Sequence, residues 1–261
     1  MNTRRLLRRW GPATAIVIAL VIAWELFVRV SATPSYVLPA PSTLPGALAG
    51  AAPQLLRHTL VTLREVLIGL AAATLVGVAT AVAIVFSPVL DRAFYPLVVA
   101  TQTVPLPVLA PLLIIFLGYG LAPKILLVGL ICFFPITVNT VDGLRNVERE
   151  ALNLLRTFGA SRWQLFRLVR WPGALPHFFS GLRIAAAYSV IGAVFGELVG
   201  ASAGLGYYVR REAPQFHTAE VYVATIILAL MGIVLFVLVR GAEWLLLPWR
   251  REQRATESGE S

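Results

Sequence analysis

Residues 66–90 read VLIGLAAATLVGVATAVAIVFSPVL, a stretch of sequence without a single charged side chain. A helix needs about 20 mostly apolar residues to cross the hydrocarbon core of a bilayer. An uncharged run of this length is therefore typical of a transmembrane helix. The sequence on either side of it shows whether this helix stands alone or belongs to a bundle.

Five further stretches have the same apolar character, so the sequence predicts an all-α membrane protein with about six transmembrane helices. The predicted spans are residues 11–30, 66–90, 93–123, 125–141, 179–200 and 221–239. Over the whole chain of 261 residues, 58% are hydrophobic and 13% are charged, whereas a soluble domain carries about 25% charged residues. So few charges cannot cover the surface of a soluble protein of this size, which excludes a typical cytosolic enzyme and a disordered chain.

The net charge of +9 comes almost entirely from arginine. These arginines interrupt apolar runs and do not line one soluble face, so basic loops beside a membrane explain the charge better than nucleic-acid binding does. Cys132 is a single cysteine inside an apolar run, and the three histidines are widely spaced. We therefore expect no disulfide framework, no metal site and no cofactor.

Orientation follows from the excess of basic residues in cytoplasmic loops. With the N-terminus inside, 16 of the 22 basic residues fall on cytoplasmic segments, so both termini are expected in the cytoplasm. Lys124 is assigned to an outside segment. The first span has a second interpretation, because arginines at 4–9 precede it and Val30-Ser31-Ala32 resembles a cleavage site, as in a signal peptide. Its length and its Glu25 favour a retained helix.

These spans divide the chain into three parts. Residues 1–56 are expected to form the N-terminal transmembrane helix and an extracytoplasmic connector. Residues 57–250 are expected to form the helical core, with a cytoplasmic loop at 142–178, and residues 251–261 a disordered tail. Gly69, Gly77 and Gly129 are interpreted as sites of close helix packing.

The cytoplasmic loop at 142–178 carries the most informative pattern. Apolar residues from Ala151 to Phe158 are spaced as on one face of a short helix, which Gly159 ends. Ser161 and Gln164 have the spacing of a capping box, so a second helix is expected to start there and to end at Pro172. The loop is thus an amphipathic, basic helix–turn–helix. It fits either a pair of helices lying on anionic lipid or a docking element for a cytoplasmic partner.

The stretch Gly159-Ala160-Ser161, followed by Val169-Arg170-Trp171-Pro172, resembles the EAA loop of ABC importer permeases. Asn153, Leu154 and Leu155 occupy the Glu-Ala-Ala places, where this sequence departs from the pattern. Further stretches resemble the nitrate/sulfonate/taurine branch of that family, in the same order and over roughly residues 38–245. They are Leu38-Pro39-Ala40-Pro41, Pro105-Leu106-Pro107, Gly118-Tyr119-Gly120, Phe134-Pro135-Ile136, Gly181-Leu182-Arg183 and residues 196–207.

The resemblance implies the type I permease architecture, in the bacterial cytoplasmic membrane. It implies two cytoplasmic ATPase subunits, an extracytoplasmic solute-binding protein and a second permease copy as partners, together with membrane lipid. The expected coupling residues are Asn153, Leu154, Leu155, Gly159, Ala160, Ser161, Arg162, Val169 and Pro172. The chain has no phosphate-binding loop of the Gly-x-x-x-x-Gly-Lys-Ser/Thr type, so the chain is not expected to be an enzyme and ATP would be hydrolysed by a separate subunit.

Candidates for the solute pathway or its gate are prolines and an acid, which are costly inside a membrane, and two glycines of an expected outer turn, Gly204-Leu205-Gly206-Tyr207, which could shape the gate or contact the binding protein. They are Pro105, Pro107, Pro111, Glu197, Gly204 and Gly206. The prolines could instead produce packing kinks alone, and Glu197 could be a structural acid bonded to the nearby backbone.

The expected function is ATP-driven import of a small solute, such as a sulfonate, taurine, nitrate or a pyrimidine-type vitamin precursor. A secondary transporter or channel acting without an ATPase is the alternative. A proton-coupled carrier usually needs paired acids or histidines in the membrane. Glu197 is the one residue of the sequence that clearly qualifies, which argues against this alternative. A membrane scaffold without transport is a third reading, against which the proline-broken span argues.

Overall fold

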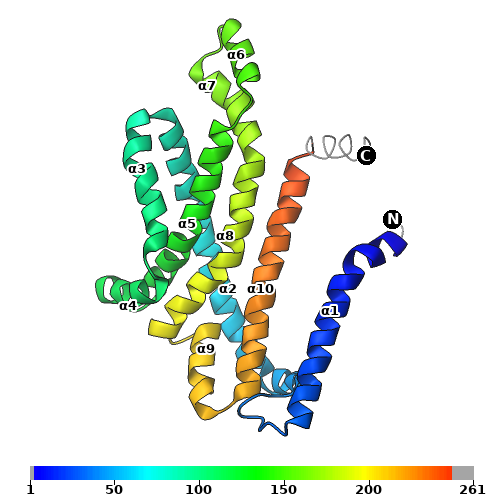
Figure 1. Cartoon of the computed structure of the whole chain (residues 1–261). Coiled ribbons are helices and arrows are strands. Elements are labelled where there is room, and N and C mark those ends of the chain that lie inside the picture. Colours follow the sequence, from blue (N-terminus) through cyan, green and yellow to red (C-terminus); the bar gives the residue numbers. More distant parts are fainter. Residues whose placement is uncertain (1–2, 249–261) are drawn as a thin grey trace.

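The structure, a computed structural model, describes residues 3–248, and its secondary structure in that range is entirely helical, with short connections between the helices (Figure 1). The α-helices are α1 Thr3–Val30, α2 Leu44–Phe86, α3 Pro88–Ala100, α4 Leu106–Leu117, α5 Leu121–Arg145, α6 Arg149–Thr157, α7 Arg162–Leu165, α8 Trp171–Gly200, α9 Leu205–Glu212 and α10 Thr218–Leu246. Three short 3₁₀ turns are η1 Pro41–Thr43, η2 Thr101–Thr103 and η4 Ala213–Gln215, and a π-helical turn, η3, covers Phe166–Arg170. The predicted tail at 251–261 lies outside the described residues.

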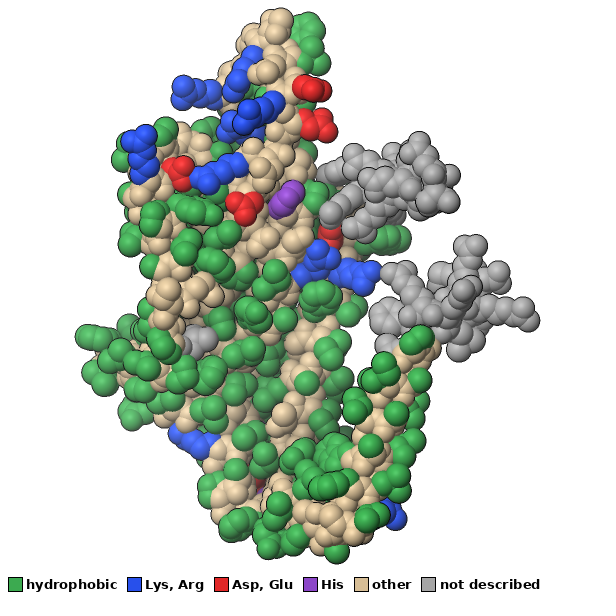
Figure 2. All heavy atoms as spheres, in the orientation of Figure 1, with side chains coloured by type: hydrophobic (Ala, Val, Ile, Leu, Met, Phe, Trp, Pro, Cys, Tyr) green, Lys and Arg blue, Asp and Glu red, His purple; other side chains and the backbone are tan. Residues whose placement is uncertain are grey.

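Within the described range, four helices are long and apolar enough to cross a membrane. They are Pro41–Phe86, Leu121–Arg145, Arg162–Gly200 and Thr218–Leu246, and the bent pair of α3 and α4 makes a fifth if it counts as one span. The predicted all-α membrane architecture is thus confirmed. The first predicted span, 11–30, lies in α1, which is not among these four helices. Apolar side chains cover the middle of the molecule, whereas basic side chains gather around the α6–α7 end (Figure 2).

The centre of the bundle is the pair α5 and α8, flanked by α2 and α10 (Figure 1). Small residues allow these helices to approach closely. Gly181 of α8 lies against the backbone carbonyl of Pro135, and Gly69 and Gly77 of α2 lie against side chains of α5. The close packing predicted for Gly129 is wrong, because nothing lies within 4 Å of the position that its Cβ would take.

The span predicted at 93–123 is not one continuous helix. The chain breaks after α3, and α4 turns away from α3 by 108° (Figure 1). Pro105 caps α4 and Pro107 lies in its first turn. Because proline has no N–H and clashes with the carbonyl four residues earlier, the helix of α3 cannot continue through this segment.

The outer ends of the first and last helices point the same way. The N-terminal end of α1 and the C-terminal end of α10 are both directed toward the α6–α7 end, while α9 lies at the opposite end of the bundle (Figure 1). This arrangement agrees with termini on one side of the membrane. Which side is cytoplasmic stays a prediction from the charge distribution.

Gly181 provides a test of the α5–α8 contact. A Gly181→Ala variant should lose stability, by about 1–3 kcal/mol, because the added Cβ would overlap the carbonyl oxygen of Pro135 and force the two helices apart. The measurement is the thermal unfolding midpoint of the purified protein in detergent. Gly129→Ala is the matched control, since its Cβ meets open space, and an equal loss in both variants would contradict the contact.

Candidate functional site

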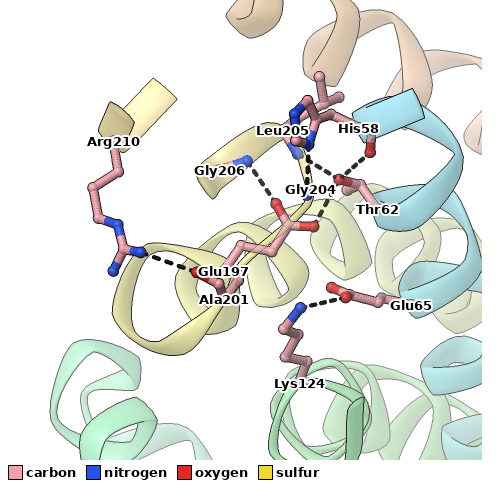
Figure 3. A network of polar contacts seen from close by, with 10 residues as sticks. All are labelled: His58, Thr62, Glu65, Lys124, Glu197, Ala201, Gly204, Leu205, Gly206 and Arg210. Carbon is pink, nitrogen blue, oxygen red and sulfur yellow. Dashed lines mark hydrogen bonds and ion pairs between the residues drawn. The ribbon is translucent and has the colours of Figure 1, made fainter. Parts of the chain in front are cut away.

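A buried carboxyl group organises the end of the bundle that lies opposite α6 and α7. Glu197, near the C-terminal end of α8, is fully buried. Its Oε1 accepts a hydrogen bond from the Thr62 hydroxyl at 2.7 Å, and its Oε2 accepts one from the Gly206 N–H at 2.6 Å (Figure 3). One side chain of α8 thereby holds both α2 and the start of α9.

Three successive backbone amides at the start of α9 are bound in this way. The Gly204 N–H donates to Nδ1 of His58 at 3.0 Å, the Leu205 N–H donates to Oγ1 of Thr62 at 2.8 Å, and the Gly206 N–H donates to Glu197 (Figure 3). The first amides of a helix have no partner within it. We call His58, Thr62, Glu197 and these three amides the polar latch.

The sequence Gly204-Leu205-Gly206 fits the latch because a side chain at either glycine would crowd Glu197. Gly204 has φ +115°, a conformation that residues with a Cβ rarely adopt. A Cβ on Gly204 would overlap the Glu197 carboxylate, and one on Gly206 would lie 3.0 Å from the Glu197 Cβ. The backbone therefore approaches the carboxylate as closely as glycine allows.

A second buried pair lies beside the latch. Nζ of Lys124, on α5, lies 2.6 Å from Oε1 of Glu65, on α2, and both residues are buried (Figure 3). The sequence did not predict this burial of Lys124, whose ammonium group lies against a carboxylate within the bundle. Its place on an outside segment stays a prediction. A charge removed from water is stable only with such a partner.

Arg210 closes the same region from α9. Its guanidinium donates to the backbone carbonyls of Leu198 at 2.8 Å and Ala201 at 3.0 Å. The carbonyls at the end of α8 have no amide partner in the helix, so the arginine replaces one. Together with the latch, this contact fixes the turn between α8 and α9.

The α9–α10 connection carries a smaller charged cluster. Glu212 is buried and contacts Nδ1 of His217 at 2.7 Å and Nε of Arg211 at 2.6 Å. Burial alone would raise the pKa of Glu212, but the hydrogen bonds from His217 and Arg211 outweigh it and hold this pKa below its usual range. The hydrogen bond to Glu212 raises the pKa of His217 and outweighs the opposing effect of desolvation, and the charge of the nearby Glu220 raises this pKa further.

Possible metal ligands meet at this connection. Atoms of Glu212, His217 and Glu220 lie within 4.8 Å of one another. The carboxylate of Glu212 already contacts His217 and Arg211. The expectation that the chain holds no metal stays a prediction.

The loop predicted to couple to a partner lies at the other end of the bundle. Gly159 has φ +76° and ends α6, with its N–H donating to the Arg156 carbonyl at 2.9 Å. The capping box is present, since the Gln164 N–H donates to Oγ of Ser161 at 3.3 Å and the Ser161 N–H to Oε1 of Gln164 at 2.7 Å. The helix–turn–helix thus has the form that these residues predict.

Pro172 does not end the second helix of the loop, contrary to the prediction. The chain runs from Arg162 to Gly200 as one continuous helix of 39 residues. The π-helical turn at Phe166–Arg170 lies immediately before Pro172, which occupies the first turn of α8. A π turn shifts the hydrogen-bond register by one residue, so the missing N–H of proline and its clash with a preceding carbonyl are both accommodated.

An aromatic contact that the sequence analysis did not single out attaches the loop to the bundle. Phe166 is buried, and its ring centroid lies 5.2 Å from that of Phe86 at the end of α2 and 5.4 Å from that of Trp163. Such ring pairs contribute about 0.5–1.5 kcal/mol beyond their buried area. The amphipathic pattern alone could have indicated a buried Phe166, but not its partner 80 residues earlier.

The predicted site residues fall into three separate places. Glu197, Gly204 and Gly206 meet in the polar latch. Pro105, Pro107 and Pro111 belong to α4, away from it. The coupling residues Asn153, Leu154, Leu155, Gly159, Ala160, Ser161, Arg162, Val169 and Pro172 lie along α6, α7, η3 and the start of α8. The sequence analysis did not identify His58, Thr62 or the Glu65–Lys124 pair as site residues. The available signals were Glu65, just before the apolar run 66–90, and Lys124, between the runs 93–123 and 125–141.

A substitution at Gly204 distinguishes the loss of the latch contacts from the effect of backbone strain alone. A Gly204→Val variant should lose about 1–3 kcal/mol through its backbone conformation, and more because its side chain displaces the Glu197 carboxylate. Gly120→Val is the matched control: Gly120 also precedes a helix, with φ +137°, but its Cβ would have nothing within 4 Å. Thermal unfolding in detergent should rank Gly204→Val clearly below Gly120→Val. Equal midpoints would contradict the role of the latch.

The His217 contact predicts a pH dependence. Since its pKa is raised in the folded protein, its contribution to stability is complete below about pH 6.5 and is lost as pH rises through the raised value. Glu212 contributes fully to stability above its ordinary pKa, and this contribution is lost only when pH falls through the lowered pKa that it has in the folded protein. Hydrogen exchange in 205–217, corrected for intrinsic rates, should therefore show less protection at pH 8.5 than at pH 5.5. His217→Gln should remove most of this difference, and an unchanged slope in the variant would refute the assignment.

Comparisons with known proteins agree with this geometry. Residues 73–251 match the family model described as "Binding-protein-dependent transport system inner membrane component". The formylaminopyrimidine transport permease protein ThiX of Halalkalibacterium halodurans is 39% identical, over 92% of this chain and 96% of that protein. The taurine transport system permease protein TauC of Escherichia coli is 29% identical, over 97% of this chain and 96% of that protein.

Among solved structures, a chain of the inward-facing MetNI methionine ABC transporter shares the fold. Its TM-score is 0.61 at 20% sequence identity, over 76% of this chain and 97% of that one. The resemblance to the nitrate/sulfonate/taurine permeases and the type I permease architecture are both confirmed. The chain belongs to the family of binding-protein-dependent transport system inner membrane components, and it is a multi-pass permease subunit of an ABC importer in the bacterial inner membrane.

Proposed function

We propose that two copies of this chain form the solute pathway of the importer and that the α6–α7 loop docks on two cytoplasmic ATPase subunits. The solute-binding protein delivers its cargo to the opposite end, beside α9. ATP binding then moves the loops, and the pathway alternates between openings on the two sides. The observation that carries this proposal is the continuous helix that joins the loop to the polar latch.

The surface of the loop supports a protein partner. Leu154, Phe158, Trp163 and Leu168 have 60%, 78%, 62% and 61% of their surface exposed, all at the α6–α7 end. Exposed apolar side chains gathered at one end of a molecule are typical of an interaction site. Arginines of the same segment surround them (Figure 2), which suits an acidic rim on the partner.

The helix from Arg162 to Gly200 suits the transmission of movement. With a rise of about 1.5 Å per residue, its 39 residues extend over roughly 58 Å. The capping box fixes its start, and Glu197 lies three residues before its end. A push on the loop would therefore reach the latch along one helix, without an intervening hinge loop.

The relatives suggest only a chemical class of solute for this importer. A pyrimidine derivative and taurine are the solutes in the names of the two relatives described above, and this chain shares more identity with the permease for formylaminopyrimidine. We therefore take neutral, pyrimidine-type compounds as the first solutes to test. Nitrate and sulfonates remain the comparison group.

A secondary transporter is the competing function, and the contacts of the buried acids favour it less. Glu197 is occupied by Thr62 and Gly206, and Glu65 by Lys124. Groups bound in this way suit a structural role better than a chain of proton carriers.

Interfacial helices on lipid are the competing interpretation of the loop.

The loop can be tested through its exposed apolar residues. Leu154→Asp and Phe158→Asp should leave the fold intact, because both side chains are exposed, but should reduce the recovered ATPase subunit about tenfold or more. The measurement is affinity purification of the tagged permease in mild detergent, with quantitative mass spectrometry of the ATPase.

Tyr119→Asp is the matched control, since Tyr119 is 82% exposed at the other end of α5. It should retain the ATPase at the wild-type level. Full ATPase recovery with both loop variants would contradict docking and favour the lipid interpretation.

A further inference from the structure

A cavity of about 430 Å³ lies where the broken helix pair α3–α4 meets α5 and α8. Its polar lining consists of Thr101, Gln102 and Tyr188, and the remaining lining residues are apolar, among them Pro105 and Ile131. The volume falls within the range of small-molecule sites, which is about 300–1,000 Å³. The break after α3 thus leaves a space of the size that a small solute needs.

The cavity lies near the middle of the membrane-spanning helices. Ile131 is ten residues into α5, about 15 Å from the start of that helix and farther from its other end. Tyr188 is likewise close to the midpoint of α8. Polar side chains at this depth normally face a water-filled pathway or a ligand.

Two polar groups of the cavity have no partner in the described part of the chain. The Gln102 amide is exposed, and Tyr188 has 45% of its surface exposed; neither side chain makes a hydrogen bond to another described residue. Thr101 differs, because its hydroxyl donates to the Val98 carbonyl at 2.6 Å. Hydrogen-bonding capacity at membrane depth is therefore left for something that enters the cavity.

The lining also restricts the charge of the occupant. Among the described residues that line the cavity, none is charged. The buried Lys124 ammonium is held by Glu65 and is not part of the lining. An anion such as a sulfonate would lose water here without gaining a cation, which is costly.

From this arrangement we infer that the cavity is a solute subsite for a neutral, planar nitrogen heterocycle, with Gln102 and Tyr188 as its polar contacts. A glutamine amide carries a donor beside an acceptor and pairs with two adjacent groups on the edge of an aminopyrimidine, as it does with adenine. The Tyr188 hydroxyl can donate or accept at another edge, and Pro105 and Ile131 offer apolar contact to the ring. The inference rests on the proposed function and adds to it the place and chemistry of recognition.

The test uses the full importer, with its ATPase subunits and binding protein, in proteoliposomes. ATP-driven uptake of radiolabelled formylaminopyrimidine and of taurine is measured beside ATP hydrolysis stimulated by the binding protein. Gln102→Leu should reduce uptake of the pyrimidine about tenfold or more and Tyr188→Phe less, while stimulated ATP hydrolysis changes less than twofold. Gln102→Asn, which keeps the amide, should recover part of the uptake.

Control variants remove a hydroxyl group elsewhere in the membrane helices and their connections. Tyr119→Phe and Thr225→Val lie outside the cavity, and both should transport as the wild type does. Uptake unchanged in Gln102→Leu and Tyr188→Phe would overturn the subsite, as would a wild-type complex that carries taurine but not the pyrimidine, or that hydrolyses ATP yet carries neither. Failure of the binding protein to stimulate ATP hydrolysis in the wild type would instead refute the proposed function.

Discussion

The hydrocarbon core of a membrane offers no water to a backbone N–H or C=O group, and this constraint governs the structure. Within the long helices, the backbone N–H and C=O groups form hydrogen bonds with one another. At the points where it cannot, side chains replace the missing partners. The first amides of α9 are bound by His58, Thr62 and Glu197, and the last carbonyls of α8 by Arg210. The latch therefore follows from the need to turn the chain sharply between α8 and α9.

The same constraint relates the two functional ends of the molecule. The helix that begins at the capping box of Ser161 ends beside the carboxylate of Glu197, so the loop and the latch belong to one element. In the proposed mechanism the loop receives movement and the latch holds the turn that the movement must displace. A rigid helix and a fully bonded turn suit a switch between two discrete states better than a gradual deformation.

Much of this architecture could be predicted because the information is local. Uncharged runs marked the spans in α2, α5 and α10, and the positions of Gly159, Ser161 and Gln164 predicted the turn and cap of the loop. What could not be predicted depends on partners distant in the sequence. Lys124 is buried because Glu65, 59 residues earlier, faces it, and Thr62 lies 135 residues from Glu197. The helix continues through Pro172 because the hydrogen-bond register changes in the π-helical turn before it, and no residue type in this segment predicts such a change.

The π-helical turn at Phe166–Arg170 has a geometric consequence for the two faces that it separates. One additional residue in a helix rotates everything beyond it by about 100° around the helix axis. The turn therefore sets the rotational phase between Trp163, on the loop side, and Gly181, which packs against α5. Because a single inserted residue fixes this phase, its removal would turn the loop surface relative to α5 while leaving the contact of Gly181 with α5 in place.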